Sequence, residues 1–296
     1  MKSVRYLVVF SVLFGFLCVG TYLFFAPYAI IPFLSPIVML ILPWALAVYL
    51  YRRLKADWRV FGIGMLTFIG SQVPHTLFNN WTLLPILENL GLGLDLPPGS
   101  PQLAVFAIAL GLSSGVFEET ARYIVYSRWL EKVRSWKDGL MFGAGHAGIE
   151  AMVIGVLALL AFLLALSSRN GEISQLTPVQ LDAYWNNPWY FHLLPLMERI
   201  SAIIFHLSAA LLVMQAFIRR NTAWYLAAIL LHTLFNATAV FALATWGGLV
   251  TEMLLLLIAV ISLWIIFALR TEEDETLIEY VPSSITPDNL KDAHDD

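Results

Sequence analysis

Four segments of this chain carry carboxylate, imidazole, guanidinium and amide groups inside otherwise apolar stretches. An ionisable side chain costs about 2.5–3.5 kcal/mol or more at the centre of a bilayer, so such residues face a bundle interior or a wet cavity. Carboxylates can act there as general bases, imidazoles can bind or orient water, and amides can stabilise an oxyanion. The segments span residues 117–122, 145–150, 205–206 and 232–236. Together they predict an active site within the membrane.

The first segment holds two adjacent glutamates and an arginine. On a helix, Arg122 lies four residues after Glu118 and three after Glu119, so it can reach either carboxylate. A buried arginine needs a carboxylate partner. The simplest division pairs one glutamate with Arg122 and leaves the other as a general base, with a purely structural ion pair as the alternative.

The other segments supply three histidines. His146 and Glu150 are spaced i, i+4, and so are His232 and Asn236, so each pair shares a helix face. An imidazole can ligate or orient a water, and an amide can donate to a developing oxyanion, although Asn236 fits an interhelix hydrogen bond equally well. His206 has no polar residue one turn away and either completes a shared site or packs as a satisfied core histidine.

Glycines surround one of these histidines. Gly143, Gly145 and Gly148 flank His146 within six residues. Small residues let neighbouring helices approach closely, and they could also leave room for the backbone of a substrate. The sequence leaves both interpretations open.

Composition indicates a polytopic membrane protein. The 296 residues are 59% hydrophobic and only 13% charged, with a mean hydropathy of +0.75, whereas soluble domains average about 25% charged residues. The lone cysteine, Cys18, excludes an intrachain disulfide or a cysteine metal site. Nine of the acids lie in the last 26 residues, which predicts an acidic, flexible cytoplasmic tail over 271–296 after a transmembrane domain over 1–270.

Apolar runs of about 20 residues, the length that crosses a bilayer, predict an all-α bundle of eight transmembrane helices. Basic residues cluster at the termini and in alternate loops. The loops on the opposite side, 80–101, 167–191 and 244–247, contain Arg169 as their only basic residue. Positive charge marks the cytoplasmic side, so both termini are expected there. The predicted helices span 6–26, 30–51, 60–79, 102–127, 139–166, 192–218, 223–243 and 248–269.

The fourth to seventh helices bring their polar residues to one level. Counted inward from the cytoplasmic ends at about 1.5 Å per residue, Glu118, His146, His206 and His232 lie about 12–18 Å deep. We therefore expect these side chains to meet near the middle of the bilayer.

Two other polar groups of the apolar stretches are expected to serve packing, including an ion pair of Glu198 and Arg199 with each other or with neighbours, and either group could instead shape a substrate vestibule. One group lies toward the outer side of the third helix, and the other in the outer half of the sixth helix. The first comprises Gln72, His75 and Asn79, and the second comprises Glu198 and Arg199.

The order of these motifs resembles a known superfamily. Glu-Glu-x-x-Arg, Phe-Gly-x-Gly-His, a lone His and His-x-x-x-Asn are similar to the glutamate-dependent intramembrane endopeptidases of the CAAX-protease and bacteriocin-processing superfamily. Within it, the run from Gly143 to Glu150 looks most like the YhfC-type membrane peptidases. The resemblance covers about residues 60–245. The superfamily pattern has three residues between the second glutamate and the arginine, whereas two separate Glu119 from Arg122.

This resemblance implies hydrolysis of a peptide bond in or near the membrane. Glu118 would activate a water, Glu119 and Arg122 would hold it in place, and His146 would help to position it. His232 and Asn236 would stabilise the oxyanion. His206 and Glu150 are additional candidates for the site.

The resemblance leaves the requirement for a metal open. Zinc could be bound by Glu118, His146, His206 and His232, although no His-Glu-x-x-His helix is present. A water held by glutamate and histidine alone fits equally well.

The expected setting is a bacterial or archaeal plasma membrane, with membrane lipid and an embedded or lipidated peptide as partners and no nucleic acid.

Two other function classes compete with the peptidase. A proton-coupled or small-solute transporter also uses buried glutamate, histidine and arginine, but no inverted repeat or pair of broken helices is evident. A non-catalytic scaffold could grip a lipid headgroup or a peptide with the same residues. The sequence leaves the substrate, the cleavage site and the oligomeric state open.

Overall fold

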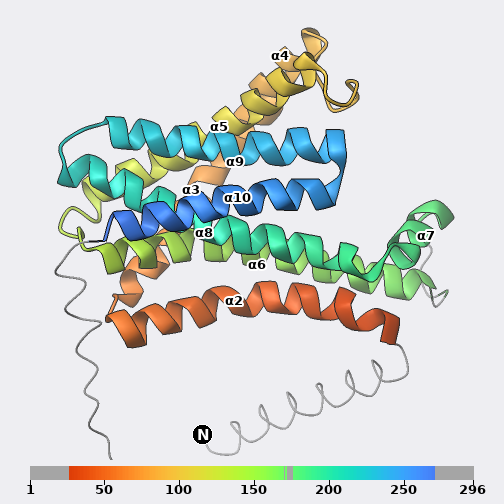
Figure 1. The fold of residues 1–296 in the computed structure, drawn as a ribbon, viewed down its shortest axis with the longest axis horizontal. Helices are drawn as coiled ribbons and strands as arrows, with labels where there is room; N and C mark the ends of the chain where they lie inside the picture. The colour runs from red at the N-terminus through yellow and green to blue at the C-terminus, as the bar shows by residue number, and fades with distance from the viewer. Residues whose placement is uncertain (1–26, 170, 172–175, 271–296) are drawn as a thin grey trace, which may run out of the picture.

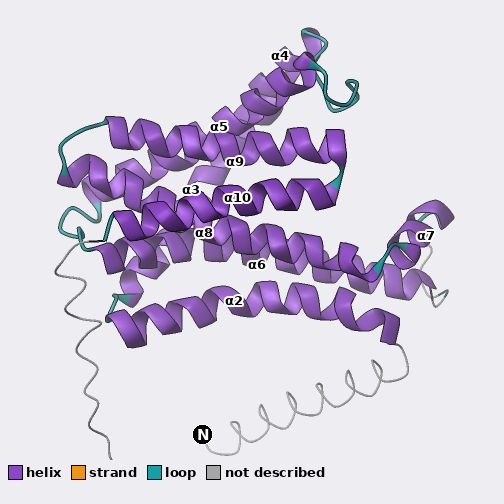
Figure 2. Ribbon diagram, in the orientation of Figure 1, coloured by secondary structure: helices purple, strands orange, loops and turns teal. Residues whose placement is uncertain are grey.

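The computed structural model describes residues 27–169, 171 and 176–270. Within these ranges every regular element is helical, which confirms the predicted all-α class (Figure 2). The predicted helix over 6–26, Cys18 and the acidic tail over 271–296 lie outside the described residues.

Seven long helices correspond to the other seven predicted spans, and their ends agree to within three residues. Six of these spans are long and apolar enough to cross a membrane, which confirms a multi-pass protein; α3 falls outside that group because its outer half carries Gln72 and His75. The total of eight helices and the cytoplasmic placement of both termini stay predictions. The long helices are α2 (Ile30–Leu54), α3 (Trp58–Phe78), α5 (Pro101–Arg128), α6 (Trp136–Arg169), α8 (Leu194–Ile218), α9 (Ala223–Trp246) and α10 (Gly248–Ala268).

Short helices occupy the segments that the sequence analysis treated as outer loops and turns. The sequence marks the start of α7. Thr177 and Gln180 form a reciprocal capping box, and Pro178 occupies the first helical position between them. A π-helical turn continues α3 directly. The periodicity of the sequence does not predict this turn. These elements are η1 (Pro27–Ala29), η2 (Asn79–Leu83), α4 (Leu84–Asn89), α7 (Pro178–Asn186) and η3 (Trp189–Leu193).

The helix α8 lies at the centre of the bundle, and 83% of its apolar membrane-crossing stretch is buried. Figure 1 shows α2, α6, α8, α10 and α9 running side by side, and each packs against the next in that order. Two further helices complete the bundle, because α3 packs on α6 and α5 packs between α9 and α3. The helices α3, α5, α6, α8 and α9 therefore surround one interior region.

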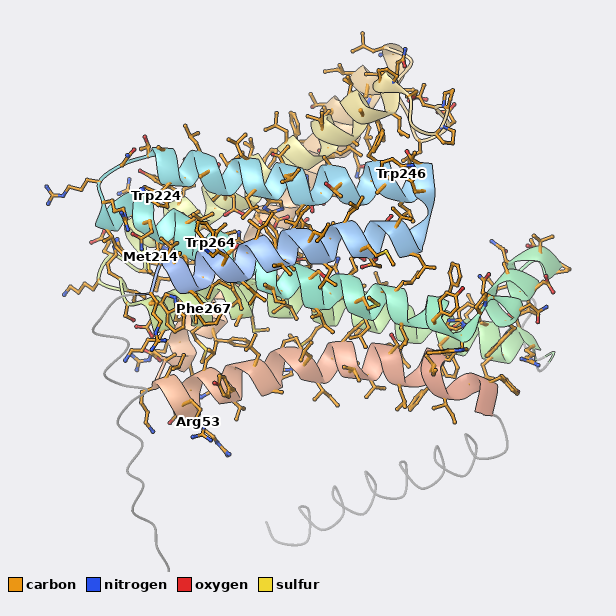
Figure 3. All side chains as sticks on the ribbon, in the orientation of Figure 1. Arg53, Met214, Trp224, Trp246, Trp264 and Phe267 are labelled. Carbon is orange, nitrogen blue, oxygen red and sulfur yellow. The ribbon has the colours of Figure 1, made fainter. Side chains whose placement is uncertain are left out.

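Large apolar side chains cover the outside of this bundle. Trp264 and Phe267 on α10 are 70% and 62% exposed, and Figure 3 shows them beside the ribbon of that helix. Trp224 and Trp246 mark the two ends of α9, where aromatic residues fit a membrane interface (Figure 3). Such an apolar exterior is the surface expected of a protein whose solvent is lipid.

The glycines around His146 allow α6 to pack closely against its neighbouring helices. A Cβ on Gly145 would lie 2.0 Å from the carbonyl oxygen of Phe61 on α3, and one on Gly143 would lie 2.8 Å from the Cα of Leu207 on α8. A Cβ on Gly148 would meet Pro43 of α2 at 2.9 Å. These glycines therefore serve close helix packing, and their space is filled by neighbouring helices.

Replacing Gly145 by alanine is expected to destabilise the protein by about 1–3 kcal/mol, because the added methyl group must push α3 away from α6. Gly62→Ala, on the same pair of packed helices, is a matched control because nothing lies within 4 Å of its Cβ position. Thermal unfolding in detergent measures both variants. Equal unfolding temperatures for the two variants would show that the close contact is not maintained in solution.

Candidate active site

Close packing of α5 against α9 brings the first and fourth polar segments together. A Cβ on Gly115 would lie 2.9 Å from the carbonyl oxygen of Ile229 and 3.4 Å from the Cβ of His232. Gly115 precedes Glu118 by three residues and so shares its face of α5. The absence of a side chain at Gly115 therefore lets His232 lie beside the glutamates.

Glu118 on α5 lies beside residues of three other helices. Its Oε2 lies 2.9 Å from Nε2 of His146 on α6, and its Oε1 accepts a hydrogen bond of 3.0 Å from Nε2 of Gln72 on α3. Nε2 of His232 on α9 lies 3.8 Å from the same Oε1, too far for a hydrogen bond. The carboxylate is 6% exposed, so these neighbours supply almost its whole environment.

Glu119 is the carboxylate that pairs with the buried arginine. Its Oε1 accepts a hydrogen bond from NH1 of Arg122, and it also lies 2.7 Å from Nδ1 of His232. Both Glu119 and Arg122 are 0% exposed. The structure thus distinguishes the two adjacent glutamates, because Glu119 pairs with Arg122 and orients His232, while Glu118 contacts Gln72 and His146.

His206 connects this cluster to a second ion pair. Its Nδ1 accepts from NH2 of Arg122 at 2.7 Å, so the proton is on Nε2, which donates to Oε2 of Glu150 at 2.7 Å. Glu150 also binds Arg199 at 2.7 Å, and Arg199 binds Glu198 at 2.5 Å. Glu198 and Arg199 thus pair with each other, and Arg199 also pairs with Glu150, so they extend the network that holds His206.

The three histidines converge as the common depth predicted. The ring centroids of His146 and His206 are 5.1 Å apart, and those of His206 and His232 are 5.4 Å apart. Asn236 lies one turn from His232, is half-buried, and forms no hydrogen bond within the described residues. Its assignment as an oxyanion donor stays a prediction.

Gln72 is the residue of this centre that the sequence analysis misjudged. It was expected to lie nearer the outer side and to pack, yet it donates directly to Glu118. The signal was present in the sequence, because Gln72, His75 and Asn79 are spaced i, i+3 and i+7 and so form a polar stripe on one helix face.

The donor set fits a divalent metal ion. Glu118, His146 and His206 each offer a ligand atom, and these atoms lie within 4.8 Å of one another. Nδ1 of His146 is buried without a hydrogen-bond partner in the described chain. His232 and His206 each hold a carboxylate on one ring nitrogen, an arrangement common among metal-binding histidines. The same atoms also fit a water held without a metal.

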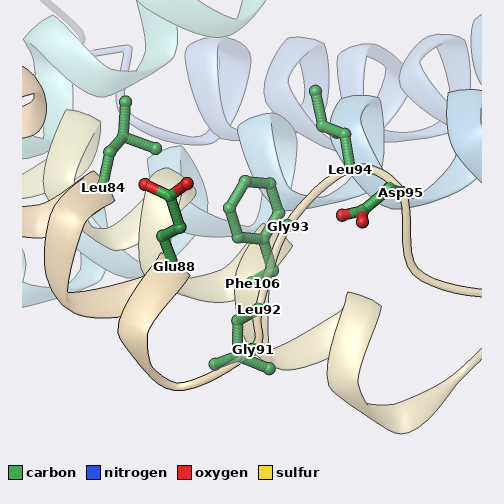
Figure 4. A pocket seen from close by; sticks show the side chains of 8 residues that line it. All are labelled: Leu84, Glu88, Gly91, Leu92, Gly93, Leu94, Asp95 and Phe106. Atoms are coloured by element: carbon green, nitrogen blue, oxygen red, sulfur yellow. The ribbon is translucent and has the colours of Figure 1, made fainter.

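A separate cavity of about 380 Å³ lies at the outer end of the bundle, between α4, the following loop and α5 (Figure 4). Two exposed acids, Glu88 and Asp95, and the ring of Phe106 line it. Phe106 precedes Glu118 by twelve residues on α5, about 18 Å along the helix axis. The cavity is therefore distinct from the polar centre.

Comparison with known proteins identifies the relatives of this chain. The sequence model of the YhfC intramembrane metalloprotease family matches residues 38–269. The membrane protein YhfC of Bacillus subtilis (strain 168) is 32% identical over 262 residues, which cover 80% of this chain and 95% of that protein. No solved structure matches the chain. From the match over most of the bundle, we conclude that this chain belongs to the YhfC family of intramembrane metalloproteases.

Proposed function

We propose that this protein is an intramembrane endopeptidase in which Glu118 activates the water that attacks a peptide bond. The observation that carries the proposal is the position of Glu118, which meets Gln72, His146 and His232 from three other helices in a buried centre. Peptide hydrolysis requires a base beside a water and a donor beside the developing oxyanion. Glu118 supplies the base, and Asn236, one turn from His232, is the candidate oxyanion donor.

The attacking water is assigned to the space between Glu118 and His232. Their facing atoms, Oε1 and Nε2, are 3.8 Å apart, a separation that one water can bridge with two hydrogen bonds of ordinary length. Nδ1 of His232 is held by Glu119, so its Nε2 is left facing Glu118. Glu118 takes the proton of the water, and His146 fixes the other carboxylate oxygen.

A divalent ion at this centre would be held by Glu118, His146 and His206, whose ligand atoms lie within 4.8 Å of one another. Binding through Nδ1 of His206 would replace the hydrogen bond that this nitrogen accepts from Arg122. When bound, such an ion supplies Lewis-acid activation of the water and of the scissile carbonyl. The chain's own contribution is to hold the ligand side chains through Glu150 and Gln72.

The substrate is a peptide embedded in, or anchored to, the membrane, since helices long and apolar enough to cross a membrane carry Glu118, His146 and His232. A quantitative comparison of new protein N-termini in cells that carry the wild type or Glu118→Gln tests this proposal. We expect at least one membrane-associated protein to be cut only with the wild type. Identical N-termini in the two strains, at equal amounts of folded protein, would refute it.

Asn236→Ala is expected to lower turnover about 100-fold, because one oxyanion donor is lost. Stability should change little, since Asn236 has no hydrogen bond within the described residues. Thr238→Ala, on the same helix, serves as a control for removing a polar group. Measured cleavage rates that are equal for the two variants would remove Asn236 from the mechanism.

Transport is the second candidate function, and one observation favours it. A hydrogen-bonded chain leads from Arg122 through His206, Glu150 and Arg199 to Glu198, whose side chain is 32% exposed. Two of its links are guanidinium groups, which do not release protons at neutral pH. Proton flux into liposomes that persists in Glu118→Gln would favour transport over hydrolysis.

A further inference from the structure

A second hydrogen-bonded chain runs along the polar face of α3 and ends at Glu118. Ser113 of α5 donates to Oδ1 of Asn79 at 2.7 Å, and Nδ2 of Asn79 lies 2.9 Å from Nε2 of His75. Nδ1 of His75 lies 3.4 Å from Oε1 of Gln72. Gln72 then donates to Glu118 at 3.0 Å.

Glu118, the last member of this chain, determines which group donates in each of the hydrogen bonds before it. A carboxylate only accepts, so Gln72 must turn its amide nitrogen toward Glu118 and its oxygen toward His75. Nδ1 of His75 must therefore carry the proton, and Nε2 must accept. Asn79 must in turn present its nitrogen to His75, which leaves its oxygen to the hydroxyl of Ser113.

Packing fixes the middle of the chain as well. His75 is 8% exposed, and its ring stacks on that of Phe117 with centroids 5.5 Å apart and planes at 28°. Phe117 is the residue before Glu118, so one contact couples the orientation of the imidazole to the backbone that carries the carboxylate. Asn79 is the first residue of η2, and π-helical turns frequently mark functional sites.

We propose that Gln72 and His75 of α3, Asn79 of η2 and Ser113 of α5 form a one-directional hydrogen-bond relay that positions the Glu118 carboxylate. Gln72, His75 and Asn79 are positioning residues, because only Gln72 touches Glu118 and none of them touches the assigned water. The relay deepens the proposed function and rests on it for its catalytic consequence. Its effect on the orientation of Glu118 is independent of any substrate.

The sharpest perturbation is Asn79→Asp, which reverses the relay at nearly constant shape. An aspartate can only accept, so Nε2 of His75 must become the donor. If His75 stays neutral, its Nδ1 then faces the oxygen of Gln72 without a proton, and Gln72 is driven to turn its oxygen toward Glu118. Asn80→Asp is the matched control, because Asn80 is the exposed neighbour in the same π-helical turn.

Two measurements on full-length protein in proteoliposomes test the relay. The first is the infrared carboxylate band of Glu118, obtained as the difference between each protein and the same protein with Glu118→Gln. The second is cleavage of the membrane peptide identified from the N-terminal comparison. We expect Asn79→Asp to shift the band and to lower kcat about tenfold with little change in KM, as for residues that orient a catalytic ligand. Asn80→Asp should change neither.

A double-variant cycle separates the relay from a general loss of packing. Once Gln72→Leu has removed the link to Glu118, adding Asn79→Asp should cause no further shift of the band and no further loss of kcat. Ser113→Ala provides a milder break at the far end if Asn79→Asp folds poorly, and its effect should also vanish beside Gln72→Leu. Equal effects with and without Gln72 would overturn the relay, and so would an Asn79→Asp variant that behaves like Asn80→Asp while the ¹⁵N resonances of His75 show a neutral ring. A band that shifts as expected without any cleavage by the wild type would support the relay and refute the peptidase.

Discussion

Glu118→Gln is expected to lower the cleavage rate by about 10²–10⁴-fold, the contribution typical of a general base. Glutamine has nearly the same shape and can keep a hydrogen bond to His146, but its amide cannot take a proton from water. The folded structure should therefore survive while the chemistry is lost. Cleavage of a membrane peptide by equal amounts of folded protein measures the effect.

The matched control for this prediction is Glu88→Gln. Glu88 is an exposed carboxylate on α4, and it lines the outer cavity, away from the polar centre. The control should retain the wild-type rate, and all three proteins should unfold at similar temperatures. A Glu118→Gln variant that retains cleavage to within a few-fold would exclude Glu118 as the base.

Arg122→Met is expected to destabilise the protein by about 3–5 kcal/mol, because it leaves a buried charge without its partner. Arg122 is 0% exposed and binds both Glu119 and His206. Methionine fills much of the same space but offers no donor to either group. Equilibrium unfolding in mixed detergent micelles measures the loss.

Two further variants make this prediction specific. Arg128→Met, at the exposed C-terminal end of the same helix, should have little effect. Adding Glu119→Gln to Arg122→Met removes the unpaired charge and should restore part of the lost stability. If the double variant is as unstable as the sum of the two single variants, the ion pair is not the source of the stability.

The helices could be predicted from the sequence because their signal is strong and local. A run such as α10, with 21 residues and a hydropathy that permits membrane crossing, has no alternative structure in lipid. The gathering of Glu118, His146 and His232 could also be predicted, since depth follows from the count of residues along each helix. Lipid disfavours these groups, which directs them to the interior.

The partners of each polar group could not be predicted, because they depend on the rotation and spacing of helices distant in the sequence. Arg122 could reach either glutamate by spacing alone, and the approach of α9 at Gly115 places His232 against Glu119 as well. Gln72 was misplaced for a similar reason. Its contact with Glu118 depends on the packing of α3 against α5 and α6, where Gly145 meets the backbone of Phe61.

The central claim is that Glu118 delivers water to a peptide bond within the membrane domain. The most direct measurement is mass spectrometry of the product formed by purified protein in proteoliposomes prepared in ¹⁸O-labelled water. We expect the wild type to place one ¹⁸O atom in the new C-terminal carboxylate and Glu118→Gln to form this product about 10²–10⁴-fold more slowly. Formation of the labelled product by Glu118→Gln at the wild-type rate would contradict this claim.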